Sequence, residues 1–299
     1  MKIWLLKKNE ESSSYEAERF KEVASQKDIV FQFVVPEEFD LIVTKEGRKS
    51  IRYNAEYTDL PDCLLPRMGA GTTYFALAVI RHLERLGVFV LNSSQSIENA
   101  KDKLASLQIL SSHNIPIPKT MLAKFPLNIQ LVENEFSYPL LIKTVSGTHG
   151  KGVFLCENKS QLEDLADLIQ ESRDPKVNVI FQEFVSSSTG KDIRVIVVGG
   201  RPLGAMLRIA ASGKFKANYS RGGEVERIEL NPEMEWLAVE SARLLNLDIA
   251  GVDLLFDGDS YKVCEVNSSP GFRGFEKATG INVPQEIYNY VRVRLGESM

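Results

Sequence analysis

Short apolar runs joined through a helix constrain the fold of this 299-residue chain more than any other feature. Residues 3–6 and 29–34 are apolar runs of strand length, and the segment between them, residues 12–25, is predicted to be a helix. Two strands joined in this way pair in parallel, because a parallel pair needs a long crossover connection. A first α/β unit with a parallel sheet is therefore predicted. It extends to about residue 95 through strands at 62–67 and 88–91 and a helix at 74–86.

The rest of the chain predicts two further α/β units. The second begins with a helix over about residues 96–113 and continues with strands at 139–145, 153–156 and 179–185. The third has strands at 192–198 and 201–209, a helix that begins at Asn231 and Pro232, and a closing pair of strands at 251–256 and 261–266. We therefore expect an α/β protein of three lobes, with residues 1–95, 96–185 and 186–299 as its N-terminal, central and C-terminal parts.

The composition excludes several classes of protein. The chain has 36 basic and 40 acidic residues and a formal net charge of −4, whereas a protein that follows nucleic-acid phosphates has a basic excess. No apolar run approaches the roughly 20 residues of a membrane span. The three cysteines lack a C-x-x-C spacing, and the three histidines are dispersed. We therefore expect a cytoplasmic protein without a nucleic-acid or membrane partner and without a histidine-based zinc site.

Lys143 ends an otherwise apolar strand, and a glycine-rich loop follows it. A buried ammonium group needs an anionic partner, and phosphate is a natural one. The loop contains Gly147, Thr148, Gly150 and Gly152 in a G-x-x-G-x-G spacing, which is neither the Walker pattern nor the dinucleotide fingerprint. Because strands flank it on both sides, we expect the loop to form the tip of a hairpin and to offer backbone N–H groups to the phosphates of a nucleotide. A plain hairpin tip with an exposed lysine head group is the alternative.

A second polar group follows the predicted strand at 179–185. Glu183, Phe184 and Val185 lead into a loop that can present backbone donors and acceptors to an adenine edge, with Phe184 against the ring. Asp192 and Arg194 are two residues apart on the next strand and therefore share one of its faces. A hairpin with surface charges is the alternative.

The most specific group contains two carboxylates and an amide. Glu265 and Asn267 alternate along one strand, so they point to the same face. A three-residue turn at 258–260 would pair residues 257 and 261, and counting back four residues on each side places Asp253 opposite Glu265. Opposed carboxylates repel each other without a cation between them, and hard oxygen ligands suit magnesium or manganese. We therefore predict a metal site at Asp253, Glu265 and Asn267, with a solvated sheet face as the alternative.

A basic set lies between these groups in the sequence. It consists of Arg208, Lys216 and Arg221, together with Asn218. The planar fork of arginine fits a phosphate or a substrate carboxylate. A charged loop without a function is the alternative.

In their order along the chain, these groups resemble the ATP-grasp superfamily and, within it, the RimK family of glutamate ligases. The resemblance covers essentially the whole chain. It rests on short stretches at residues 66–69, 100–104, 147–153, 182–184, 192–194, 218–223, 250–253, 265–271 and 276–281. It implies an ATP-grasp fold, with the nucleotide between the central and C-terminal lobes.

The resemblance also implies a role for each matching residue. Asp253, Glu265 and Asn267 hold two divalent ions, magnesium or manganese. Arg208, Arg221 and Asn267 are the implied catalytic group, in which the arginines steady an acyl phosphate or a substrate carboxylate. The implied ATP-binding residues are Lys103, Lys143, Gly147, Thr148, Gly150, Gly152, Glu183, Phe184, Val185, Asp192, Lys216 and Asn218. His149 and Lys151 depart from the uncharged pair that the family pattern leads us to expect.

The implied reaction joins a carboxylate to an amine at the expense of ATP. ATP phosphorylates the carboxylate, and the amine then displaces phosphate to form an amide, which needs alignment and charge neutralisation rather than a nucleophilic side chain. The resemblance implies L-glutamate as the added amino acid, a protein or peptide C-terminus as the acceptor, and a homo-oligomer. Arg67, Arg208 and Arg221 are then candidate carboxylate binders. A small acid, a coenzyme or a short peptide as acceptor is the alternative, and a non-catalytic nucleotide sensor is a lesser one.

Overall fold

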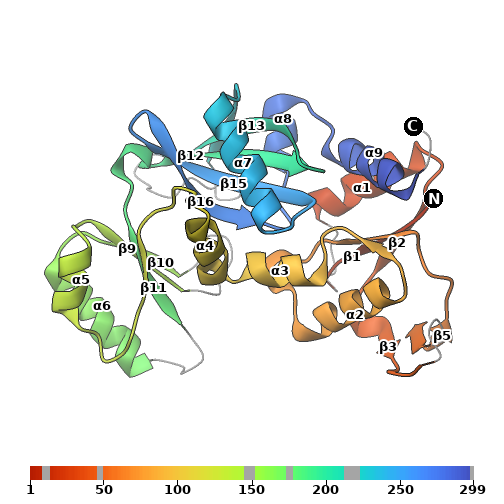
Figure 1. The fold of residues 1–299 in the computed structure, drawn as a ribbon, viewed down its shortest axis with the longest axis horizontal. Coiled ribbons are helices and arrows are strands. Elements are labelled where there is room, and N and C mark those ends of the chain that lie inside the picture. The colour runs from red at the N-terminus through yellow and green to blue at the C-terminus, as the bar shows by residue number, and fades with distance from the viewer. Residues whose placement is uncertain (9–13, 46–49, 145–151, 173–177, 212–222, 297–299) are drawn as a thin grey trace.

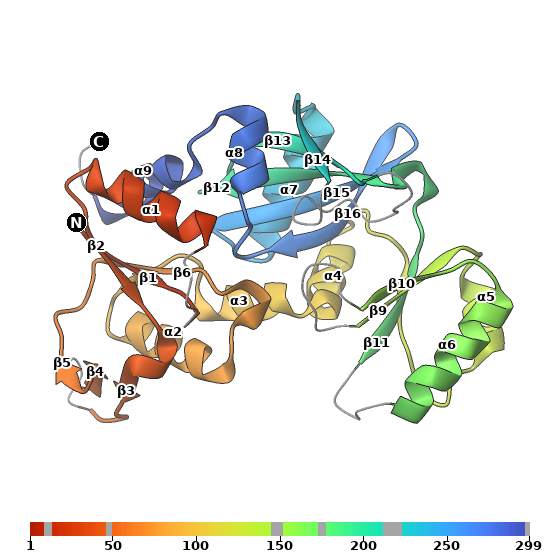
Figure 2. The same cartoon turned by 180° about the vertical axis from the view of Figure 1, so that it is seen from behind.

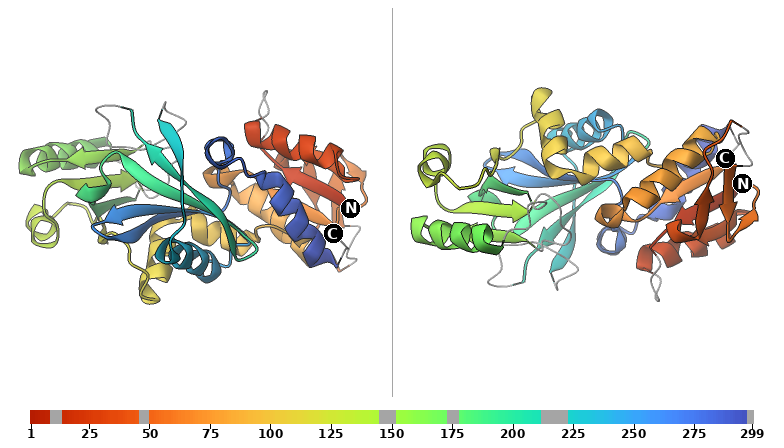
Figure 3. Two further views of the ribbon diagram at one scale, coloured as in Figure 1. Left: turned by 90° about the horizontal axis from the view of Figure 1, so that it is seen from above. Right: turned by 90° about the horizontal axis from the view of Figure 1, so that it is seen from below.

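Three main sheets, each with its own helices, follow one another in the computed structural model of the protein. The structure describes residues 1–8, 14–45, 50–144, 152–172, 178–211 and 223–296. The N-terminal sheet and the central sheet lie at opposite ends of the molecule, and the largest sheet lies between them (Figures 1 and 3). None of the helices in the described residues is long and apolar enough to cross a membrane.

The N-terminal sheet is parallel, as the opening pattern predicts, and has the strand order β2-β1-β6-β7. Its elements are β1 (Lys2–Leu6), α1 (Tyr15–Ser25), β2 (Val30–Val34), β6 (Cys63–Pro66), α2 (Tyr74–Arg85) and β7 (Phe89–Val90). A small antiparallel sheet that we did not predict is inserted between β2 and β6. It consists of β3 (Phe39–Leu41), β4 (Ile51–Tyr53) and β5 (Glu56–Tyr57), and the 3-10 helices η1 (Pro36–Glu38) and η3 (Gly69–Gly71) flank the region.

The single helix predicted over residues 96–113 is wrong, because Asp102 divides it into α3 (Ser94–Lys101) and α4 (Lys103–Ser112). Asp102 is extended, with φ −83° and ψ 105°. Its Oδ1 atom accepts hydrogen bonds from the backbone N–H groups of Leu104 at 2.9 Å and Ala105 at 3.0 Å. The side chain thus satisfies donors at the start of α4 that have no partner within the helix. Lys103 is consequently the first residue of a new helix.

Removal of this cap is expected to weaken the fold measurably. Asp102→Ala should lower the free energy of unfolding by about 1 kcal/mol, because two backbone donors lose their acceptor. Asp102→Asn, which keeps an acceptor oxygen, should retain most of that stability. Urea denaturation of the two variants and the wild type measures the difference. Equal losses in both variants would contradict the capping role.

The central sheet is antiparallel, with the strand order β10-β9-β11-β8. Its elements are β8 (Thr120–Leu122), α5 (Ile129–Glu135), β9 (Leu140–Thr144), β10 (Val153–Cys156), α6 (Lys159–Ser172) and β11 (Val179–Glu183). Both helices cover the same side of this sheet (Figure 1). They bury a separate small core around Leu140, Ile142 and Phe181.

The largest sheet is antiparallel, with the strand order β14-β13-β12-β15-β16. Its elements are η4 (Ser186–Ser188), β12 (Lys191–Val198), β13 (Arg201–Ile209), β14 (Glu224–Ile228), α7 (Pro232–Leu244), β15 (Ile249–Asp257), β16 (Ser260–Asn267), α8 (Arg273–Thr279) and α9 (Val283–Leu295). Helix α7 begins at the Asn231-Pro232 pair, as predicted, because the Asn231 side chain accepts a hydrogen bond from the N–H of Met234 at 2.9 Å. Helices α7 and α4 share the core on one side of the sheet.

A single core joins the N-terminal sheet to the largest sheet. Phe20 on α1 makes edge contacts with Phe272 and with Tyr288, at centroid separations of 5.7 Å in both cases. The Tyr288 hydroxyl donates a hydrogen bond to the backbone oxygen of Phe20 at 2.8 Å. Helices α1 and α9 therefore lie side by side, and both chain ends are at this end of the molecule (Figure 2). The predicted lobe boundaries at residues 95 and 185 stay a prediction.

Candidate active site

The β15–β16 hairpin places Asp253 directly opposite Glu265, as predicted. The route to this pairing differs from the predicted one. The turn has two residues, because Asp257 pairs with Ser260, and Gly258 supports the tight bend with φ +64°. A bulge between Asp253 and Leu254 leaves Cys264 without a partner residue on β15. The extra residue in the bulge offsets the missing turn residue and restores the predicted register.

Asp253 is held by two arginines on the neighbouring strands. Arg194 on β12 donates from Nε to Oδ1 and from Nη2 to Oδ2 of Asp253, both at 2.7 Å. Arg208 on β13 contacts Oδ2 from Nη2 at 2.9 Å. Burial alone would raise the pKa of Asp253, but the two guanidinium groups hold it below its usual range. The carboxylate is therefore a fixed anion in the middle of the sheet face.

The same network extends to Asp192. Arg208 donates from Nε and Nη2 to the two carboxylate oxygens of Asp192, at 2.5 and 2.7 Å. Burial raises the pKa of Asp192, against the opposing effect of Arg208. Burial would lower the pKa of Arg208, but its two carboxylate neighbours raise it. Two anions and two cations thus alternate across β13, β12 and β15, and the charges are nearly balanced within the protein.

Three oxygen-bearing side chains of this face fit a divalent cation. A carboxylate has about four lone pairs, and the arginines use three of those of Asp253, so Oδ1 retains one. The side-chain carboxylate of Glu265 forms no hydrogen bond or ion pair with the described residues. Asn267 donates its amide N–H to the backbone oxygen of Gly251 at 3.3 Å, which leaves its oxygen available. Such a sparse set of hard oxygens is typical of magnesium, which keeps waters and substrate phosphates as further ligands.

This donor set is smaller than the usual all-protein metal site. In the described part of the chain, no cluster of three or more histidine, cysteine, aspartate or glutamate side chains is suited to a metal ion. The candidate site has only two carboxylates, and its third oxygen comes from an amide. The arrangement therefore fits an ion that arrives with a phosphorylated substrate better than a permanently bound structural ion.

Of the residues predicted to bind ATP, the described ones lie on the central sheet, near its junction with the largest sheet, on α4 and, for Asp192, on β12. Lys143 on β9 donates a hydrogen bond to the side-chain oxygen of Gln182 on β11. Val153 pairs with Lys143, so β9 and β10 form the predicted hairpin around the glycine loop. Gly152 is at its end with φ +75°. Gly147, Thr148 and Gly150 lie outside the described residues, and so do Lys216, Asn218 and Arg221.

Glu183 ends β11 at the junction between the central and largest sheets. Lys262 on β16 contacts its Oε1 at 2.7 Å, and the backbone N–H of Lys119 donates to its Oε2 at 3.0 Å. Burial would raise the pKa of Glu183, but these donors lower it. Val185, two residues further, is buried, while Phe184 is partly exposed. Lys103, at the start of α4, is partly buried, and α4 packs against β16. Glu183 and helix α4, which begins at Lys103, thus lie beside β16, the edge strand that carries Glu265 and Asn267.

Two contributors to the site were not identified from the sequence. Arg194 was placed on the same face as Asp192 but given no role. The role of Arg194 becomes visible only from the register of β12 and β15, which places Arg194 opposite Asp253. Lys262 was overlooked because its partner, Glu183, is 79 residues away in the sequence.

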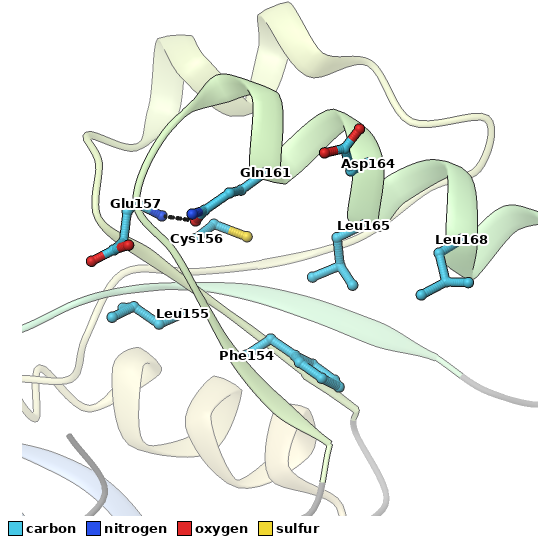
Figure 4. A pocket seen from close by; sticks show the side chains of 8 residues that line it. All are labelled: Phe154, Leu155, Cys156, Glu157, Gln161, Asp164, Leu165 and Leu168. Carbon is cyan, nitrogen blue, oxygen red and sulfur yellow. Dashed lines mark hydrogen bonds between the residues drawn. The ribbon is translucent and has the colours of Figure 1, made fainter. Parts of the chain in front are cut away.

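A groove of about 500 Å³ lies elsewhere, between β10 and α6. Figure 4 shows Phe154, Leu165 and Leu168 facing this space, while the side chain of Gln161 accepts a hydrogen bond from the backbone N–H of Glu157 at 2.9 Å. None of the candidate site residues that the structure describes lines the groove. It is therefore separate from the charged face of the largest sheet.

Comparison with known proteins shows the family to which the chain belongs. Residues 100–291 match the RimK-like ATP-grasp domain, and residues 1–97 match the RimK PreATP-grasp domain. A probable alpha-L-glutamate ligase of Rhodopirellula baltica is 39% identical over 282 residues, which are 94% of this chain and 69% of that protein. A probable alpha-L-glutamate ligase of Vibrio atlanticus is 36% identical over 292 residues, which are 97% and 95% of the two chains.

Solved structures show the same fold. The ATP-grasp ligase PsnB, complexed with a phosphomimetic variant of its minimal precursor, Mg and ADP, aligns over 98% of both chains with a TM-score of 0.76 and 20% identity. The fold is therefore that of the ATP-grasp ligases, enzymes that join a carboxylate to an amine. Within this class, the chain belongs to the RimK-like family.

Proposed function

We propose that the protein adds L-glutamate to the C-terminus of a protein or peptide through an acyl phosphate. The single observation that carries this proposal is the full-length similarity to proteins named probable alpha-L-glutamate ligase. A structure of PsnB complexed with the precursor peptide PsnA2 and AMPPNP supports a peptide acceptor, because the PsnB fold is shared over 99% of this chain.

The residues of this chain supply alignment and fixed charge. Asp253, Glu265 and Asn267 would hold magnesium or manganese, and two such ions would neutralise the phosphate charge that develops during transfer. Lys143 and Lys103 would contact the phosphates. Arg208 is fixed by two carboxylates, so its position does not change as charge moves in the reaction. The structure therefore offers a preorganised surface rather than a nucleophile.

Product masses test the proposal directly. The enzyme is incubated with ATP, magnesium and glutamate, with and without a panel of peptides that have acidic C-termini. Mass increments of one or more glutamyl residues on a peptide, with matching ADP release, are the expected result. The control is the same peptides with amidated C-termini, which present no carboxylate there to phosphorylate. ATP turnover with a small acid and with none of the peptides would contradict a peptide acceptor and indicate a ligase that acts on small acids.

A further inference from the structure

Arg67 occupies the topological switch point of the N-terminal sheet. The chain runs from β1 outward to β2 on one side, and then returns to β6 and β7 on the other side. In an open parallel sheet, ligands bind beyond the carboxyl ends of the two strands where the order reverses. These strands are β1 and β6, and Arg67 is the first residue after β6. Its backbone N–H donates to the oxygen of Leu6, the last residue of β1, at 2.8 Å.

Two aromatic rings lie beside the Arg67 guanidinium. Its centre lies 5.8 Å from the ring of Phe20 and 5.6 Å from the ring of Phe272. Nη2 donates to the backbone oxygen of Pro270 at 2.6 Å, whereas the buried Nε has no hydrogen-bond partner in the described part of the chain. Among the described residues, no carboxylate forms an ion pair with it. Burial lowers the pKa of Arg67 to about 10, although the more distant charge of Glu16 opposes this. A cation in such surroundings is stabilised by an anion that enters the site.

The segment that contacts Arg67 is continuous with the metal hairpin. Pro270 follows Asn267, the last residue of β16, by three residues. The buried Asn92 fixes this segment, because its amide donates to the backbone oxygens of Ile249 and Ser268, both at 2.7 Å. Gly251, which pairs with Asn267, has no room for a side chain, since a Cβ atom there would lie 2.5 Å from Cβ of Pro270. Arg67 is thus held in a fixed position relative to the carboxylates of β15 and β16.

We propose that Arg67 binds a substrate carboxylate that is not phosphorylated during the reaction. This inference rests on the proposed function, in which glutamate brings two carboxylates that must remain intact while its amine reacts. A carboxylate that accepts hydrogen bonds from a guanidinium has fewer free lone pairs and is a weaker nucleophile toward ATP. The fork of arginine, already fixed by Pro270 and the two phenylalanines, is suited to this task. Either the incoming glutamate or the acceptor can supply the carboxylate.

Neutral analogues of glutamate test the pairing. Glutamate, glutamine and isoglutamine differ in which carboxylate is replaced by an amide. In the wild type, the analogue that lacks the bound carboxylate should be a poor substrate. Arg67→Gln should lower kcat/KM for glutamate by about 30-fold or more, because a buried charge pair loses one partner. The same variant should process that analogue almost as well as the wild type does, and its KM for ATP should be unchanged.

Arg273→Gln is the matched control. Arg273 is exposed near the same interface, where its guanidinium lies 5.6 Å from the ring of Tyr15, and its replacement should leave the discrimination intact. If Arg67→Gln instead raises KM for the acceptor alone, the bound carboxylate belongs to the acceptor, which also supports the inference. A uniform loss over glutamate, both analogues and the acceptor would show that Arg67 only stabilises the structure. That result, or the absence of any loss, would overturn the inference.

The proposed function can fail separately from this inference. A wild-type enzyme that transfers no glutamate would contradict the proposed function. The Arg67 comparison would then be made with the amino acid that the wild type does use and its amide analogue. Selective loss for the acid form would still support the site, and equal loss for both forms would overturn it.

Discussion

Glu265→Ala is expected to lower ADP production by about 1,000-fold or more at saturating magnesium, while the protein remains folded. Glu265 lies opposite Asp253 across the β15–β16 hairpin. Its side-chain carboxylate forms no hydrogen bond or ion pair with the described residues, so it is the carboxylate most available to a cation. If Glu265 is a metal ligand, as proposed, its loss removes a ligand from ions that would each contribute several kcal/mol to phosphoryl transfer. A coupled assay for ADP, with circular dichroism on the same samples, measures both quantities.

Glu226→Ala provides the control for that result. Glu226 is an exposed glutamate on β14, at the far edge of the same sheet, so its removal changes the net charge equally. Its activity should remain close to that of the wild type. Wild-type ADP production by Glu265→Ala would show that the metal ions are held elsewhere.

Arg194→Met is expected to lower the free energy of unfolding by about 2–3 kcal/mol in the absence of divalent ions. The Arg194 and Asp253 side chains are only 14% and 8% exposed, and the substitution leaves a buried carboxylate with Arg208 as its remaining partner. Removal of one member of a buried ion pair costs more than the pair contributes, because the other charge stays desolvated. Urea denaturation measures the change.

A second arginine–carboxylate pair of the same chemistry serves as the comparison. Arg243 donates to both oxygens of Glu240, at 2.8 and 2.5 Å, but its side chain is 65% exposed. Arg243→Met should therefore leave the unfolding midpoint unchanged within error, since water already screens the pair. Equal effects of the two substitutions would show that burial of the Asp253 network contributes nothing to stability.

The sequence predicted elements where local chemistry and tertiary structure agree. The strand predicted at 3–6 is β1, because a run of apolar residues in a parallel sheet is buried on both faces. Helix α7 begins where Asn231 and Pro232 indicate a start. The break at Asp102 was missed because Ile97, Leu107 and Leu110, all buried apolar residues, suggest one continuous helix. A cap within such a pattern is visible only when the backbone conformation is known.

The candidate site was only partly predictable for a related reason. Alternation along a strand gives the face of each side chain, so Glu265 and Asn267 could be grouped from the sequence. Their relation to Asp253 depends on a turn and a bulge whose individual lengths were not predictable, although their sum was. Arg67 was already a candidate carboxylate binder, but its contact with Pro270 and that of Arg194 with Asp253 join residues that are 203 and 59 apart in the sequence. No local pattern contains that information.

The core that α1 shares with α9 determines which parts of the enzyme can move during turnover. The N-terminal and largest sheets are joined by buried aromatic side chains, whereas the central sheet has a core of its own. A polar contact, that of Lys262 on β16 with Glu183 on β11, links the central sheet to its neighbour. We therefore expect the central sheet to move relative to the other two sheets more readily than those two move relative to each other. Arg67 and the carboxylate hairpin would keep their relative positions during such a motion.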